Sequence, residues 1–213
     1  MDSHKLIVKF FADASPDASP PAQHEFVPVF HSFIQAHAIP DHLLIDVADY
    51  QHVWHGPGIL LAAHEGNFYS DQGEGRLGLM YQRKQPLPGM NHLRERLAHV
   101  FAAALRVCAK LEDEPAFAGR LKFRTDEVVL RFNDRLAAPN SPETYRLVEP
   151  EVRTFLEELY PGDEVHLEPR HAPLTLLEVR IKVSGSSPVK DLLERLEALP
   201  ALSAAALAPA PDR

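Results

Sequence analysis

Apolar and polar positions alternate or recur at helical spacing along the first half of the chain. Short runs rich in β-branched and aromatic residues predict strands, and apolar residues that recur every three or four positions predict helices. A proline-rich stretch at 12–25 predicts a loop after the first strand. The expected elements are a strand at 5–11, a helix from 27 to before Pro40, strands at 43–49, 59–65 and 76–84, and a helix from Asn91 to about Lys110.

The second half shows the same order of patterns. A strand comes first, then a loop and a helix that stops near Pro161, then two strands and a final helix. The expected elements are strands at 126–132, 164–169 and 174–183 and helices at 143–159 and 188–199.

An offset of 122 residues aligns the two halves without a gap across strand, helix and strand, for example Phe10 with Phe132 and Phe33 with Phe155. We interpret this match as an internal duplication. The pattern predicts an α+β fold of two tandem ferredoxin-like (βαββα) units with antiparallel sheets, related by a pseudo-twofold axis. The expected divisions are a first unit at 1–113 with a histidine-rich hairpin loop, a second unit at 114–200, and a flexible Ala/Pro tail at 201–213.

This plan of repeated strand, helix, hairpin and helix resembles that of the dimeric α+β-barrel proteins, among them the chlorite-dismutase-like haem proteins. The resemblance is one of architecture, and the sequence contains no haem-ligand motif. It implies that the two units meet through their sheets.

Strand alternation separates a helix-covered face of each sheet from an open face. Ionisable residues fall on the expected open faces. Burying each of them without a partner would cost on the order of several kcal/mol. Two interpretations follow: a solvated face with cross-strand ion pairs, or a polar pocket with a function. The residues concerned are Lys9, Asp46, His64, Arg131, His166, Glu168, Glu178 and Arg180.

The segment 46–71 concentrates the candidate chemistry. Imidazole and carboxylate groups together suit a divalent transition metal such as zinc, iron, manganese or nickel, and His52 and His55 are the candidate ligands. Asp46 and His64 could instead work as an acid–base pair across the hairpin, which makes them the candidate catalytic residues. The candidate ligand-binding residues are Asp49, Tyr50, Trp54 and Lys9.

Each of these features also has a structural interpretation. The histidines could cap turn carbonyls, and Gly56-Pro57-Gly58 could simply reverse the chain. The leading hypothesis is a ligand- or metal-binding protein, with enzymatic activity left open. The alternative is a non-catalytic assembly or adaptor protein that uses the same segment as a protein–protein interface, with exposed aromatic residues such as Trp54 at its centre.

Composition and charge narrow the partners. The 213 residues carry a net charge of −8, divided equally between 1–113 and 114–213, so no basic patch for nucleic acid is visible. An acidic surface also disfavours anionic membranes, and no apolar run approaches the ~20 residues of a membrane span. The single cysteine, Cys108, lies on an apolar helical stripe and fits a core thiol in a reducing cytoplasm. We therefore expect a small molecule or a protein as the partner, with a homo-oligomer possible.

Overall fold

The structure is a computed structural model that describes residues 4–14, 19–54, 56–117, 119–172 and 174–199. Its described part is an α+β fold with one open antiparallel sheet of eight strands in the order β2-β3-β4-β5-β1-β6-β8-β7. The strands are β1 (Leu6–Ala14), β2 (Leu44–Asp49), β3 (Ile59–Ala63), β4 (Gly66–Asp71), β5 (Gly78–Arg83), β6 (Leu121–Phe132), β7 (Val165–Arg170) and β8 (Leu177–Val183). The helices are α1 (Phe26–Gln35), α2 (Leu93–Glu112), α3 (Pro142–Leu159) and α4 (Val189–Glu197), and two 3-10 turns occupy Gln23–Glu25 and Gly73–Gly75.

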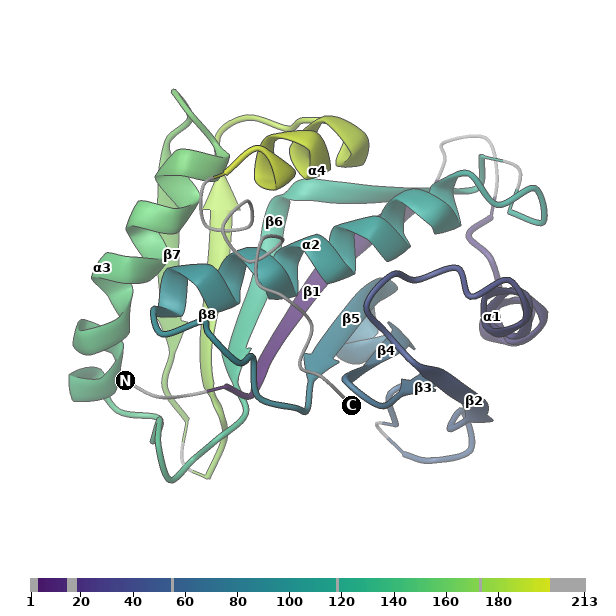
Figure 1. Cartoon of the computed structure of the whole chain (residues 1–213), viewed down its shortest axis with the longest axis horizontal. Coiled ribbons are helices and arrows are strands. Elements are labelled where there is room, and N and C mark those ends of the chain that lie inside the picture. The colour runs from purple at the N-terminus through teal and green to yellow at the C-terminus, as the bar shows by residue number, and fades with distance from the viewer. Residues whose placement is uncertain (1–3, 15–18, 55, 118, 173, 200–213) are drawn as a thin grey trace.

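All four helices cover the same face of the sheet, and α2 lies across its centre (Figure 1). Alternate residues of the central strand β1, namely Leu6, Val8 and Phe10, point into the core beneath α2. Phe101 of α2 meets Phe10 edge-on at 5.7 Å between ring centroids and meets Phe155 of α3 at 5.0 Å. The other face of the sheet carries no helix among the described residues and is the open face.

Helix α3 begins where the sequence supplies a hydrogen-bond acceptor for its first turn. The Ser141 hydroxyl accepts a hydrogen bond from Thr144 N at the start of α3, and Pro142 occupies the first helical turn, where its missing N–H costs nothing. In α2 the apolar stripe expected from the sequence is buried, and it includes Leu97 and Cys108.

The strand order does not show two tandem ferredoxin-like units. The two halves meet at their sheet edges, because β1 pairs with β6 and one sheet runs continuously through both halves of the chain. The division of the chain near residue 113 stays a prediction, and the predicted tail at 201–213 lies outside the described residues.

Three local features differ from the expected elements or add to them. The segment Gly66–Asp71 forms β4, a strand between those expected at 59–65 and 76–84. Arg96 of α2 is buried. A β-bulge between Leu44 and Asp46 shifts the alternation of β2, so Leu43 and Ile45 are 62% and 58% exposed instead of facing the helices.

No helix in the described ranges is long and apolar enough to cross a membrane.

Candidate functional site

A compact turn between β2 and β3 carries several of the residues that the sequence singled out. Tyr50 N donates to Gly58 O, and Val53 N donates to Tyr50 O, each at 2.9 Å. Both carboxylate oxygens of Asp49 accept hydrogen bonds from Gln51, one from its backbone N at 2.8 Å and one from its side-chain amide at 2.9 Å. Asp49, predicted as a ligand-binding residue, is therefore engaged in shaping the turn.

The glycine at the end of this turn allows a close approach. Gly58 has φ +76°, and an added Cβ would lie 2.2 Å from Ser70 O and 2.7 Å from Gln23 Oε1. Gln23 Oε1 accepts a 2.5 Å hydrogen bond from the Ser70 hydroxyl, which in turn accepts from Ile59 N. The backbone thus makes room for Gln23, whose side chain is almost fully buried (6% residue exposure).

This turn and the loop after β4 enclose a hollow of about 560 Å³, which we call the aromatic hollow. The Tyr50 and His52 rings lie nearly parallel on its wall, 16° between planes and 6.4 Å between centroids, and Trp54 is 88% exposed. Gln23 Nε2 is buried at this hollow and makes no hydrogen bond with any described residue. The lining residues are Gln23, Tyr50, Gln51, His52, Val53, Trp54, Gly56, Gly58, Gln72, Gly73, Glu74 and Gly75.

Lys9 holds the second wall of the aromatic hollow in place. Its ammonium, 2% exposed, donates to Asp71 Oδ2 at 2.5 Å and to the carbonyl oxygens of Gly73 and Arg76 at 3.0 Å each. Burial lowers the pKa of Lys9, while the charge of Asp71 opposes the shift. Because an ammonium has three donors, these contacts use all of them, and Lys9 anchors the 71–76 loop. The ligand-binding role of Lys9 stays a prediction.

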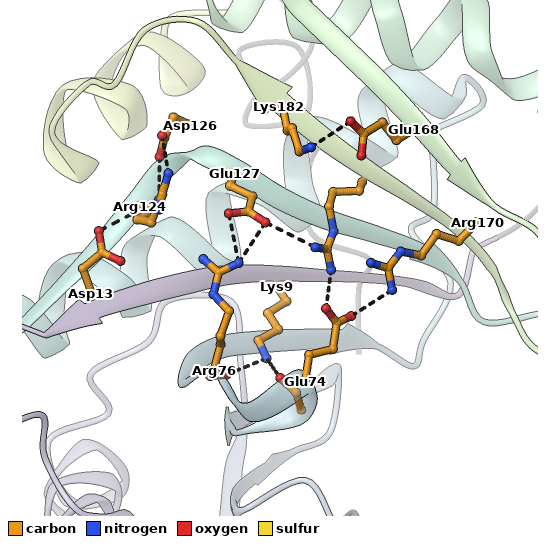
Figure 2. A network of polar contacts seen from close by, with 12 residues as sticks. Lys9, Asp13, Glu74, Arg76, Arg124, Asp126, Glu127, Glu168, Arg170 and Lys182 are labelled. Atoms are coloured by element: carbon orange, nitrogen blue, oxygen red, sulfur yellow. Dashed lines mark hydrogen bonds and ion pairs between the residues drawn. The ribbon is translucent and has the colours of Figure 1, made fainter.

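Beyond this loop, ion pairs run across the open face (Figure 2). They form one alternating series, which we call the arginine ladder: Arg76, Glu127, Arg180, Glu74, Arg170, Glu178 and Arg131. Arg76 binds both oxygens of Glu127 at 2.9 and 3.0 Å, and its guanidinium lies 3.8 Å from the ring centroid of Phe11. The series joins the 71–76 loop to β6, β8 and β7.

The charges of the arginine ladder stabilise its carboxylates in the ionised form. Hydrogen bonding to Arg76 lowers the pKa of Glu127. Partial burial acts to raise the pKa of Glu74, but its hydrogen bond and ion pairs with Arg180 and Arg170 outweigh burial, and the pKa lies below its ordinary value. Glu74 adopts a left-handed backbone conformation (φ 64°, ψ 20°), unusual for a residue with a side chain, and it lines the aromatic hollow as well.

A second group of ionisable side chains lies on the helix-covered face near β5. His42 bonds Tyr81 Oη through Nε2 at 2.8 Å and Pro40 O through Nδ1 at 3.0 Å. Burial lowers the pKa of His42, and it lowers the pKa of His99 to about 4, with Arg83 adding to the effect. The His42 ring packs against Phe68 and Tyr81, at 5.2 and 5.4 Å between ring centroids, which places it at the edge of the core.

The predicted catalytic pair is not brought into contact. Asp46 pairs in register with Ala62, its Oδ1 accepts a hydrogen bond from Val47 N, and no hydrogen bond or ion pair joins it to His64, which is also described. His64 is exposed, and its backbone N donates to Leu43 O. The register explains the difference, because it places Asp46 opposite Ala62 and not opposite His64.

The predicted metal site can be followed only in part. In the described part of the chain, no group of three or more His, Cys, Asp and Glu side chains could hold a metal ion. His52 lines the aromatic hollow, whereas His55 lies outside the described residues. Chelation by His52 and His55 therefore stays a prediction about a segment that the structure does not describe.

Of the predicted residues, the structure brings Tyr50, His52 and Trp54 together at one hollow. Sequence reasoning missed Gln23, which lies in the proline-rich loop, and Glu74, which lies in a glycine-rich turn. Polar residues in such loops carry no periodic signal, so only the tertiary pairing with Ser70 and Arg180 reveals their place.

No protein-family model matches the chain, and neither a curated protein nor a solved structure matches it at a significant level.

Proposed function

We propose that the chain is a small-molecule-binding protein and that the aromatic hollow is its binding site. The observation that best supports this proposal is the Gln23 amide, a buried donor that has no partner among the described residues. This amide lies at a hollow lined by Tyr50, His52 and the exposed Trp54. A buried donor left unsatisfied costs about 1–3 kcal/mol, and a ligand acceptor would relieve that cost.

The walls indicate the class of ligand. Aromatic side chains favour a flat or ring-shaped partner, and the amides of Gln23, Gln51 and Gln72 favour hydrogen-bonding groups without charge. The one carboxylate on the wall, Glu74, is already neutralised by Arg180 and Arg170. These features support an uncharged ring compound that carries hydrogen-bond acceptors, such as a nucleoside.

If the aromatic hollow also carries out catalysis, His52 is the side chain on its wall that suits general acid–base chemistry. The pair Asp46 and His64, by contrast, lines none of the described hollows.

Because Trp54 is the only tryptophan, its fluorescence tests the proposal directly. We expect at least one of adenosine, guanosine, cytidine and uridine to change the emission saturably, whereas ribose leaves it unchanged. The variant Gln23→Glu keeps the oxygen that accepts from Ser70 but replaces the amide donor with a second oxygen. We expect it to weaken binding at least about tenfold, because a buried hydrogen bond to the ligand is lost and the new oxygen repels the ligand's acceptor. The exposed Gln35→Glu is the matched control, and the nucleoside form of the proposal is wrong if none of the four changes the emission.

The alternative, an assembly role, is favoured by a separate observation at β2. This strand forms one edge of the sheet and exposes Leu43 and Ile45, and open strand edges can pair with another chain. In this alternative two copies pair through β2, and light scattering would show a dimer that Ile45→Lys converts to a monomer. A monomeric wild-type protein would contradict it.

The internal duplication also remains a proposal, with support from the strand register. β1 and β6 are central neighbours, flanked by β5 and β8, the last strand of each half. Val8 pairs with Leu130, its own counterpart at an offset of 122 residues, in the middle of the Leu6–Phe10 pairing. An antiparallel pair related by a twofold axis has such a self-matching position at its centre.

A further inference from the structure

The arginine ladder has one positive charge more than it has negative charges. It begins at Arg76 and ends at Arg131, so four guanidinium groups alternate with three carboxylates. Neighbouring Lys9 and Lys182 are paired with Asp71 and Glu168. At the Arg76 end, Arg124 is paired with both Asp13 and Asp126, so these residues add one negative charge there and leave the positive excess at the other end. The whole chain has a net charge of −8, so a local excess of positive charge on a partly buried surface is unusual here and favours the binding of one anion.

The excess charge lies at the Arg131 end of the ladder. Arg131 Nε donates to Glu178 Oε2 at 2.6 Å, and its Nη1 meets only Met80 Sδ, at 3.8 Å, among the described residues. Arg170 forms ion pairs with Glu74 and Glu178, both at 3.5 Å, and makes no hydrogen bond with a described residue through its side chain. Guanidinium donors in both residues are therefore available to an acceptor of suitable geometry.

These two arginines line a second hollow of about 400 Å³ on the open face, which we call the arginine hollow. Ile7, Met80 and Leu176 belong to its lining and to one apolar cluster separate from the main core. The arginine hollow shares Ala172 and Thr175 with a wider depression of about 780 Å³. That depression is lined in part by Leu174 and Leu136, which are 90% and 98% exposed.

We propose that the arginine hollow binds the carboxylate of an aliphatic monocarboxylic acid. The carboxylate lies between Arg131 and Arg170, and the hydrocarbon chain runs over Ile7, Met80 and Leu176 towards Leu174. This site is distinct from the aromatic hollow and does not depend on the function proposed for it.

The same groups argue against other ligands. Glu178 lies in the lining, so a second negative charge on the ligand would meet repulsion, and a cation would meet two arginines for one glutamate. A carboxylate without a hydrocarbon chain would make no use of the apolar surface, whose burial favours binding. A ligand with one negative charge and a hydrocarbon chain contacts both the arginines and the apolar residues of the arginine hollow.

The test is calorimetric titration of the whole chain with octanoate, acetate and octylammonium at low salt. We expect saturable binding of octanoate, at least tenfold weaker binding of acetate, and weaker binding of octylammonium. Adding 0.5 M NaCl should weaken octanoate binding, since the contact is ionic and partly exposed. Absence of octanoate binding, or equal binding of octylammonium, would overturn the proposal.

The variant Arg170→Gln removes one guanidinium from a half-exposed position where its contacts are long, so the fold should tolerate it. We expect it to lower octanoate affinity at least fivefold, whereas Arg146→Gln, an exposed arginine on α3, leaves affinity unchanged. Unchanged affinity in Arg170→Gln would contradict the proposal. In protein labelled at its three methionine methyls, the resonance that Met80→Leu removes should shift with octanoate and not with acetate.

Discussion

Lys9 on β1 and Arg131 on β6 occupy comparable places on the open face and are used differently. The ammonium of Lys9 is buried, and all three of its donors bind the 71–76 loop. The guanidinium of Arg131 donates to Glu178 through Nε and also lines the arginine hollow. A cation at the centre of a sheet can therefore fix a loop that lines a neighbouring site, or it can remain available to a ligand. The number of hydrogen-bond acceptors that the adjacent loop provides decides between the two.

The two faces of the sheet also differ in how they bury ionisable groups. On the helix-covered face near β5, burial holds the pKa of His42 and the pKa of His99 below their ordinary value. On the open face, charged groups are paired in the arginine ladder. The two faces should therefore respond to mutation, acid and salt in different ways.

The largest effect should follow from Lys9→Met. The substitution leaves the buried Asp71 carboxylate without its cation, a change that costs about 3–5 kcal/mol when one partner of a buried pair is removed. Urea unfolding measures the loss. The double variant Lys9→Met/Asp71→Asn should recover part of it, and equal stability of the single and double variants would show that the pair is not coupled.

Acid should destabilise the histidine side first. His99 stays neutral in the folded chain down to a pKa of about 4 but takes up a proton near 6.5 when unfolded, so the unfolded state binds more protons between these values. The free energy of unfolding should fall as the pH drops through this window, with up to about 3 kcal/mol from His99 and a further share from His42. Protonation of Glu74 and Glu127 in the arginine ladder also lowers the free energy of unfolding. This loss begins only as the pH falls below the ordinary value of 4.5, because the pKa values of both carboxylates are lowered in the folded chain.

The variant His99→Gln isolates this contribution. Its stability should depend less on pH between 6.5 and 4 than that of the wild type, whereas the exposed His166→Gln should retain the wild-type dependence. Parallel curves for wild type and His99→Gln would contradict the assignment.

The arginine ladder should show a smaller loss. Glu127→Gln removes a carboxylate shared by Arg76 and Arg180, and we expect a decrease of about 2 kcal/mol in the free energy of unfolding, below that of a fully buried pair. Raising the salt concentration should reduce the difference between wild type and variant. A loss below about 0.5 kcal/mol would place the ladder with ordinary surface ion pairs.

The smallest effect on stability should come from the aromatic hollow. Trp54 is 88% exposed, so Trp54→Ala should change the free energy of unfolding by no more than about 0.5 kcal/mol while nucleoside binding, followed by calorimetry, is lost. A destabilisation above about 1 kcal/mol would mean that Trp54 serves the fold rather than a ligand.

Periodicity predicted the parts of the fold that depend on local pattern. Alternation in β1 correctly placed Val8 and Phe10 towards the helices and Lys9 on the open face, and the apolar stripe of α2 is buried. The α+β class is confirmed, and the extra strand β4 was missed because its glycine and serine resemble a turn.

The parts that were not predicted depend on tertiary contacts. The bulge in β2 cannot be read from LLIDVAD, yet it exposes Ile45. The register of the hairpin, which places Asp46 opposite Ala62 and not opposite His64, cannot be read from the sequence either. The arginine ladder joins residues up to 106 positions apart. The register of β6 with β8 and the 71–76 loop held by Lys9 bring these residues together. Gln23 has no distinguishing neighbours in sequence, and its importance follows from one buried amide group.

The central claim, that the Gln23 amide donates to a ligand in the aromatic hollow, is tested most directly by following the Gln23 side-chain ¹⁵N and ¹H resonances during a nucleoside titration. The account predicts that both amide protons of Gln23 shift and become protected from exchange, along the same saturation curve as the Trp54 emission. Gln23 resonances that stay unchanged while Trp54 responds would contradict it.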